Sequence, residues 1–324
     1  MDEIRRKEDA PALRFEDRRR RRTLKRRLVK LAIVLGGLTL VYAGMCLADY
    51  FSQARSAKET SQQLFEVYTG DEPVENQAPQ TGGAILGSFV LEVDDPYETP
   101  EEERERPKVL NWPDNPQMVV SDAFVRLQRR NRDIVGWLSI DHLLEEPVVL
   151  RDNDTYLRRD YLGRANDNGA LFLEENTRLT HRPDTYIIFG HNMKTGEMFG
   201  CLRNYENPAF YRRDPLLSFN VLYEDGRYVV FSVADVDTQP GQLRHVPFMD
   251  LENCTRSQRA DYIQRLENLS ILRTEVPVDA DDQLLLMVTC EGDSRFRRVV
   301  SARRLRAGET EEHVRRIAAG ATAL

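Results

Sequence analysis

Short apolar runs separated by turn-forming residues occupy the chain from about residue 116 onward. Two of the separating dipeptides, Asn168-Gly169 and Asp225-Gly226, are typical of tight hairpin turns. Many short strands at modest spacing indicate a mainly antiparallel barrel or sandwich. The runs expected to form strands are 134–140, 147–150, 170–173, 186–189, 228–233, 284–288 and 299–302.

Two segments of the same region have helical periodicity instead. The first ends near Asn131, and its apolar face consists of Val119, Val120, Phe124 and Leu127. The second begins at Thr255, because Thr255-x-x-Gln258 fits a capping box. Its apolar stripe consists of Tyr262, Ile263, Leu266 and Leu269. The pattern therefore predicts a β-rich domain with at least two helices over residues 116–306, followed by a tail at 307–324.

The longest apolar stretch lies near the N-terminus. Residues 31–48 contain no charged side chain, and at 1.5 Å per helical residue they cover about 27 Å, roughly the thickness of a bilayer core. Leu28 and Val29 can extend the stretch. We therefore expect residues 28–48 to form a single transmembrane anchor.

The charges on either side of this stretch predict its orientation. Residues 1–30 hold 13 Lys and Arg against 6 Asp and Glu, whereas Asp49 and Glu59 follow the stretch. The positive-inside rule places the basic tail, residues 1–27, in the cytoplasm and the rest of the chain outside the cell. A cleaved signal peptide is the alternative, but its apolar region would be unusually long and no clear A-x-A cleavage site follows.

Composition excludes several classes of protein. The chain has 324 residues, of which 41% are hydrophobic, which is too many for a wholly disordered chain. Four cysteines are too few for a disulfide-dense scaffold. The net charge of −7 combines +7 in residues 1–30 with −14 in the remainder, which argues against a nucleic-acid partner for the main domain.

An acidic segment separates the anchor from the β-rich domain. Residues 51–110 hold 13 Asp and Glu against 5 Lys and Arg, and their periodicity is weak. We expect residues 49–115 to form a mostly extended extracellular stalk or linker. The apolar segment 84–93 is a candidate for a docked strand within it.

Three residues at the ends of expected strands could carry chemistry. His191 follows the run YIIFG, Cys290 ends the run LLLMVTC, and Arg297 begins RRVVSARRL. Taken singly, each has an ordinary structural explanation, such as a buried cysteine or a solvated arginine. Together they could converge on one groove. No metal site is expected, because Cys201, Cys254 and Cys290 show neither C-x-x-C pairing nor a histidine at ligand spacing.

These motifs resemble those of the class B sortases, the membrane-anchored cysteine transpeptidases of Gram-positive bacteria. The matching segments run in family order and cover nearly all of residues 116–306. They are NRDIVGWLSI (131–140), PVVLRDNDTYL (147–157), YIIFGHNMKTGEMFGCLRNY (186–205), LLLMVTC (284–290) and RRVVSARR (297–304). The resemblance implies a closed antiparallel or mixed β-barrel of about eight strands, with an N-terminal helix and a helix in the long connection before the cysteine strand.

The resemblance implies roles for the three residues. Cys290 would attack a backbone carbonyl as a thiolate, His191 would transfer protons, and Arg297 would hold the carbonyl and the developing oxyanion. The residues expected to help bind substrate are Thr289, Asn192 and Glu291. No cofactor and no metal are implied.

The assignment of the arginine depends on strand register. The family pattern Arg-x-Val-Val-x-Ala matches 297–302, and the period of a strand puts Arg297 and Arg298 on opposite faces. We assign Arg297, with Arg298 as the alternative. The connection EGDSRF after Cys290 is short for the family.

The implied function is cleavage of a C-terminal sorting motif in secreted proteins and transfer of the acyl group to an amine of peptidoglycan or its precursor. The connection 235–283 would form part of the peptide groove. Two alternatives stay open: a pilin-polymerising sortase that uses a lysine amine, and a non-catalytic single-span binding or regulatory protein with a degenerate barrel. The expected location is the cell membrane, with the catalytic domain outside.

Overall fold

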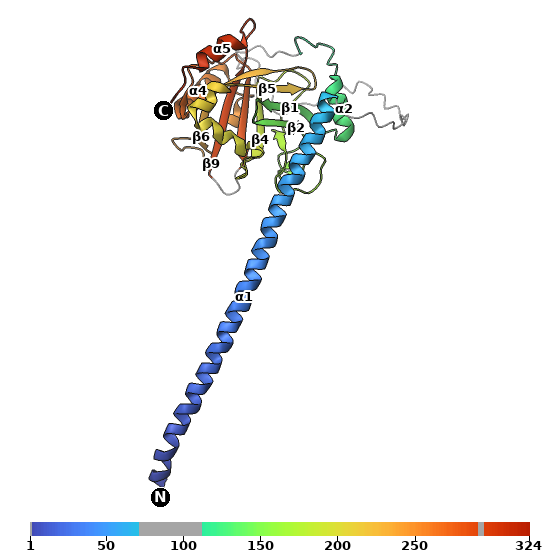
Figure 1. Cartoon of the computed structure of the whole chain (residues 1–324). Coiled ribbons are helices and arrows are strands. Elements are labelled where there is room, and N and C mark those ends of the chain that lie inside the picture. The colour runs from blue at the N-terminus through green and yellow to red at the C-terminus, as the bar shows by residue number, and fades with distance from the viewer. Residues whose placement is uncertain (1, 71–111, 291–294) are drawn as a thin grey trace, which may run out of the picture. The chain divides into compact units, whose positions relative to one another are not determined.

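The computed structural model describes residues 2–70, 112–290 and 295–324. Contacts divide the chain into two units, Met1–Arg55 and Ser56–Leu324. The first unit is part of one long helix, α1 (Asp2–Thr69), which continues into the second unit (Figure 1). The candidate strand at 84–93 lies outside the described residues.

The apolar part of α1 has the length and composition of a membrane-spanning helix. Lys30–Thr69 is long enough to cross a bilayer, and its most apolar 18-residue window has a mean hydropathy of 2.1 and is 0% buried. This fits the single-pass anchor expected at 28–48.

The C-terminal part of α1 corrects the expectation of an extended stalk, because residues 49–69 are helical. Within the second unit, Leu64 is buried, and the ring of Tyr68 stacks on Trp137 with centroids 4.5 Å apart and planes 5° apart. The buried face also contains the small or polar residues Ala57 and Ser61. These residues weaken the hydrophobic periodicity, so the sequence pattern did not predict this helix.

The second unit is built around a closed β-barrel (Figure 1). Its eight strands follow the order β1-β2-β3-β4-β8-β9-β6-β5. The pairs β2–β3 and β4–β8 are parallel and the other pairs are antiparallel. The strands are β1 (Ile134–Ile140), β2 (Leu144–Val149), β3 (Leu171–Leu173), β4 (Thr185–His191), β5 (Leu216–Val221), β6 (Arg227–Asp237), β8 (Leu284–Cys290) and β9 (Phe296–Arg304). The mixed eight-strand barrel expected from the resemblance is confirmed.

Helices and short elements surround the barrel. They are α2 (Asp122–Arg130), α3 (Pro208–Arg213), α4 (Arg256–Leu269), α5 (Glu311–Ala318), the 3₁₀ helices η2 (Thr155–Leu157), η3 (Phe199–Glu206) and η4 (Phe248–Asp250), and the paired strands β7 (Leu272–Arg273) and β10 (Thr322–Ala323). Helices α2 and α4 are the two that the periodicity predicted. At the start of α4, Thr255 and Gln258 make both hydrogen bonds of the expected capping box.

The structure contains one strand that was not predicted and lacks one hairpin that was. Strand β5 was not predicted, because Ser218 and Asn220 interrupt its apolar residues. The hairpin expected at Asn168-Gly169 is wrong, since β2 and β3 pair in parallel and therefore cannot be joined by a tight hairpin. The hairpin at Asp225-Gly226 is confirmed between the antiparallel strands β5 and β6.

Alternate residues of the barrel strands belong to two hydrophobic clusters. On β8, Leu285 and Met287 lie in the larger cluster, which includes residues of β1 to β4. Leu286 and Val288 lie in a second cluster together with Leu266 of α4. Both faces of β8 are therefore buried, which explains why its sequence is a continuous apolar run rather than an alternating one.

Candidate active site

Strands β4 and β8 bring His191 and Cys290 to the same end of the barrel. The two strands pair in parallel, and the register makes His191 and Cys290 partners at their C-terminal ends. Adjacent strands lie about 4.8 Å apart, so the two backbones are direct neighbours although 99 positions separate them in the sequence. The side chain of Cys290 lies outside the described part of the structure.

Strand β9 adds Arg297 at the same edge. The sheet order places β8 between β4 and β9, and β9 starts where the antiparallel β8 ends. Thus His191, Cys290 and Arg297 occupy one end of three neighbouring strands. Val299 and Val288 lie in the cluster with α4, whereas Val300 lies in the other cluster. The period of two therefore puts position 297 on the face of β9 to which Val299 belongs, and position 298 on the opposite face.

The glycine before His191 allows close packing at the end of β4. A Cβ atom at Gly190 would lie 2.4 Å from Leu171 Cδ2 and 2.8 Å from Phe199 Cδ2. Only glycine fits between these side chains. The Gly-His and Met-Phe parts of the motif are thus linked by contact, since Phe199 begins η3 and packs against the position before His191.

The loop between His191 and η3 is held by backbone contacts. A Cβ atom at Gly200 would lie 2.0 Å from the carbonyl oxygen of Met193. Arg203 Nε donates to Gly200 O at 2.9 Å, and its Nη2 donates to Met193 O at 3.1 Å. Asn192 and Met198 form an isolated antiparallel bridge across the loop. The loop and η3 therefore form one connected piece that follows directly from His191.

The imidazole of His191 is oriented by the chain around η2. It is half-buried, and its Nε2 lies 2.7 Å from the carbonyl oxygen of Leu157. A carbonyl oxygen can only accept a hydrogen bond, so Nε2 carries a hydrogen and donates it. This leaves Nδ1 as the nitrogen that can take up or release a proton in chemistry.

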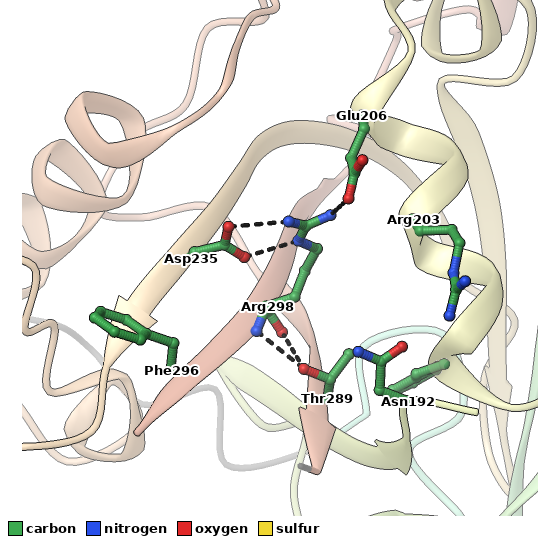
Figure 2. A pocket seen from close by; sticks show the side chains of 8 residues that line it. Asn192, Arg203, Glu206, Asp235, Thr289, Phe296 and Arg298 are labelled. Carbon is green, nitrogen blue, oxygen red and sulfur yellow. Dashed lines mark hydrogen bonds and ion pairs between the residues drawn. The ribbon is translucent and has the colours of Figure 1, made fainter. Parts of the chain in front are cut away.

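Arg298 is bound to two carboxylates. Its Nε and Nη2 donate to the two oxygens of Asp235 at 2.8 and 2.9 Å, and its Nη1 pairs with Glu206 (Figure 2). Burial by itself lowers the pKa of Arg298, but the bonds to Asp235 and Glu206 outweigh this effect and raise the pKa above its usual value. Arg298 is therefore permanently charged, and its charge is paired with two carboxylates. Arg297, in contrast, donates Nη1 to the carbonyl oxygen of Phe296 at 3.2 Å.

A cavity of about 430 Å³ lies beside these residues (Figure 2). It is lined by Thr289 and Asn192, two of the three residues expected to bind substrate. The third, Glu291, lies outside the described residues. Thr289 Oγ1 accepts the backbone N–H of Arg298 at 2.9 Å, so it is tied to β9 as well as lining the cavity. The other lining residues are Phe199, Arg203, Glu206, Asp235, Phe296 and Arg298.

Sequence reasoning missed Asp235 and Glu206. Asp235 lies just beyond an expected strand run, and Glu206 just beyond the longest family-like motif, so each was within two residues of a recognised segment. The sequence around Asp235 and around Glu206 contains no pattern that would predict contact with Arg298. Among the described side chains, no group of three or more His, Cys, Asp or Glu is arranged to hold a metal ion.

Comparisons with known proteins find similarity to sortases. No family model matches the chain. Sortase B of Listeria monocytogenes is 28% identical over 179 residues, which cover 55% of this chain and 70% of that protein. Sortase B of Staphylococcus aureus is 26% identical over 174 residues, covering 53% and 69%.

The barrel also matches solved structures. A Bacillus anthracis protein described as similar to sortase B has a TM-score of 0.56 at 23% identity, over 79% of this chain and 97% of the other. That similarity concerns the fold. The two curated relatives, together with the motifs at the ends of β4, β8 and β9, support a class B sortase.

Proposed function

We propose that the chain is a cysteine transpeptidase that cleaves a C-terminal sorting motif of a secreted protein and joins the acyl group to an amine of peptidoglycan or its precursor. The observation that supports this most directly is the register of β4 and β8, in which His191 and Cys290 are partners at the strand ends. The sequence similarity to sortases supports the same class of reaction.

The first half-reaction forms a thioester. The Cys290 thiolate attacks the carbonyl carbon at the scissile peptide bond, and a C–S bond forms while the C–N bond breaks. His191 donates a proton to the departing amine, which would otherwise be a poor leaving group. The second half-reaction reverses these roles: an acceptor amine attacks the thioester, His191 takes its proton, and Cys290 leaves as a thiolate.

Two surrounding groups suit this scheme. The hydrogen bond from His191 Nε2 to Leu157 O holds the ring in one orientation, so that Nδ1 would carry the transferred proton. Arg297, on the strand next to Cys290, would stabilise the negative charge that develops on the carbonyl oxygen. In this assignment Thr289, Asn192 and Glu291 contact the substrate near the scissile bond.

The proposed location follows from α1. Its apolar part would anchor the protein in the cell membrane, and the basic N-terminal residues would stay in the cytoplasm. The barrel would then face outward, where secreted proteins and the cell wall are accessible.

The test is detection of the acyl-enzyme. The full-length protein in detergent micelles is incubated with candidate sorting peptides, and mass spectrometry locates any thioester. We expect the adduct on Cys290, its loss in Cys290→Ala, and a fall in its rate of formation by about 10² or more in His191→Ala. Cys201 is an internal control, because burial raises the pKa of its thiol to about 12 and keeps it unreactive. An adduct that persists in Cys290→Ala would refute the proposal.

A further inference from the structure

Arg298 connects three parts of the active-site edge. Its guanidinium binds Asp235 of β6, the residue that pairs with Arg298 in the β6–β9 register, and also Glu206, the last residue of η3. The side chain of Arg298 is 17% exposed, against 39% for Asp235 and 55% for Glu206. The arginine is thus the inner member of the cluster, and the carboxylates reach it from two different elements (Figure 2).

The contact with Glu206 acts on the loop that follows His191. Helix η3 is joined to that loop by the close approach of Gly200 to Met193 O and by the hydrogen bond that Arg203 Nη2 donates to the same oxygen. Glu206 fastens the other end of η3 to β9. Since η3 and the loop form one connected piece, a contact at its far end restricts the position of His191.

The backbone of Arg298 is hydrogen-bonded to β8, the strand that ends at Cys290. The last ladder pair of β8 and β9 is Val288 with Val299, and beyond it the N–H of Arg298 donates to Thr289 Oγ1 instead. Thr289 directly precedes Cys290. One residue therefore touches η3 through its side chain and β8 through its backbone, and it is adjacent in sequence to Arg297.

We propose that Arg298 is a positioning residue, which holds η3 and the His191 loop against the strands that carry Cys290 and Arg297. This inference rests on the proposed function. It differs from the role of an oxyanion-binding arginine, because two carboxylates already neutralise the charge of Arg298 and leave little of it to stabilise a developing anion. The two adjacent arginines thus have separate tasks.

The first measurement needs no substrate. Iodoacetamide alkylation of Cys290 is followed by mass spectrometry as a function of pH, which reports the ionisation of the thiol. A histidine held beside a thiol favours the thiolate. We expect Arg298→Met to loosen that arrangement and move the midpoint of the alkylation profile upward by about half a pH unit or more, with a smaller upward shift in Glu206→Gln.

A matched control lies on the same strand. Arg304, at the other end of β9, pairs with Glu224 at 2.9 Å and is 20% exposed, so Arg304→Met removes a similar ion pair far from the active-site edge. It should leave the alkylation profile unchanged. Arg298→Lys, which keeps one charged contact, should lie between wild type and Arg298→Met.

The second measurement is transpeptidation. Arg298→Met should lower kcat about tenfold and change KM by less than about threefold, because misplacement of catalytic groups affects the chemical step. The double variant Arg298→Met/Glu206→Gln should be no slower than Arg298→Met alone. If the alkylation profiles of Arg298→Met, Arg298→Lys and Glu206→Gln all coincide with wild type, the positioning role is wrong. If wild type alkylates normally but no sorting peptide is acylated, the proposed function fails while the alkylation series still decides the role of Arg298.

Discussion

Arg259 of α4 donates a hydrogen bond of 2.6 Å from Nη1 to the hydroxyl of Thr185, the first residue of the strand that ends at His191. Four further hydrogen bonds go to carbonyl oxygens just before β4, just before β8 and at the end of η4. The acceptors are Ala280 at 2.9 Å, Leu251 at 2.7 Å, and Asp184 and Asp282 at 2.9 Å each. Arg259 is 0% exposed, so it connects α4 to the beginnings of the two strands from inside the protein.

Arg259→Met should therefore destabilise the barrel. The substitution leaves several buried carbonyl oxygens without donors, and we expect a loss of about 3 kcal/mol in the free energy of unfolding, since each such group costs about 1–3 kcal/mol. Differential scanning calorimetry should show a melting temperature lower by roughly 6–12 °C. Arg265→Met, at an exposed position of the same helix, should change the free energy by less than about 0.5 kcal/mol. Equal effects of the two variants would contradict this account.

Glu146 should make the stability of the domain depend on pH. Its half-buried carboxylate accepts a hydrogen bond of 2.7 Å from Ser61 of α1, and burial raises its pKa to about 7. Because the folded-state pKa exceeds the unfolded value, ionisation of Glu146 opposes folding. Its penalty is absent well below the unfolded pKa of about 4.5, grows as the pH rises towards 7, and stays constant above pH 7.

Glu146→Gln tests this effect, because an amide can still accept from Ser61 but does not ionise. Relative to wild type, the variant should gain about 3 kcal/mol of unfolding free energy at pH 8 and about 1 kcal/mol near pH 5, as measured by urea denaturation. A difference between the two proteins that stays constant from pH 5 to pH 8 would show that Glu146 does not titrate in this range.

The two neighbouring arginines should differ in kinetic effect. Loss of an oxyanion donor typically lowers the rate by about 10²–10³, so we expect Arg297→Ala to reduce thioester formation by that factor. Arg298→Ala should reduce it only about tenfold, in keeping with a positioning role. Single-turnover kinetics with a sorting peptide give both numbers. The reverse order would refute both the oxyanion-binding role of Arg297 and the positioning role of Arg298.

Gly190 should not tolerate a side chain. In Gly190→Ala, the new methyl group would lie 2.4 Å from Leu171 Cδ2 and 2.8 Å from Phe199 Cδ2, so the side chains or the strand must move. We expect a loss of about 1–3 kcal/mol in stability together with a lower rate of thioester formation. Gly320→Ala is the control, since the nearest contact of its Cβ atom would be Ile317 O at 3.4 Å. Wild-type stability and activity in Gly190→Ala would show that the strand end is not tightly packed.

Much of the local structure was readable from the sequence. The apolar runs that became β1, β4 and β8 are nearly continuous, because these strands are buried on both faces. Helix α4 could be predicted because Thr255 and Gln258 cap it through contacts only three residues apart. The extended conformation expected for 49–69 was wrong, since residues such as Ala57 and Ser61 carry little hydrophobic signal although they are buried on the barrel.

By itself, the sequence determined which residues stand at the ends of strands, among them His191 and Cys290, because strand ends are marked by local composition. Only the tertiary structure decided that β8 lies between β4 and β9 and that Arg298 binds Asp235 and Glu206. Such neighbours are separated by 63 and 92 positions along the chain. Their contact depends on how the whole barrel closes, through hydrogen bonds between strands and burial of both faces, and no pattern within a single segment contains that information.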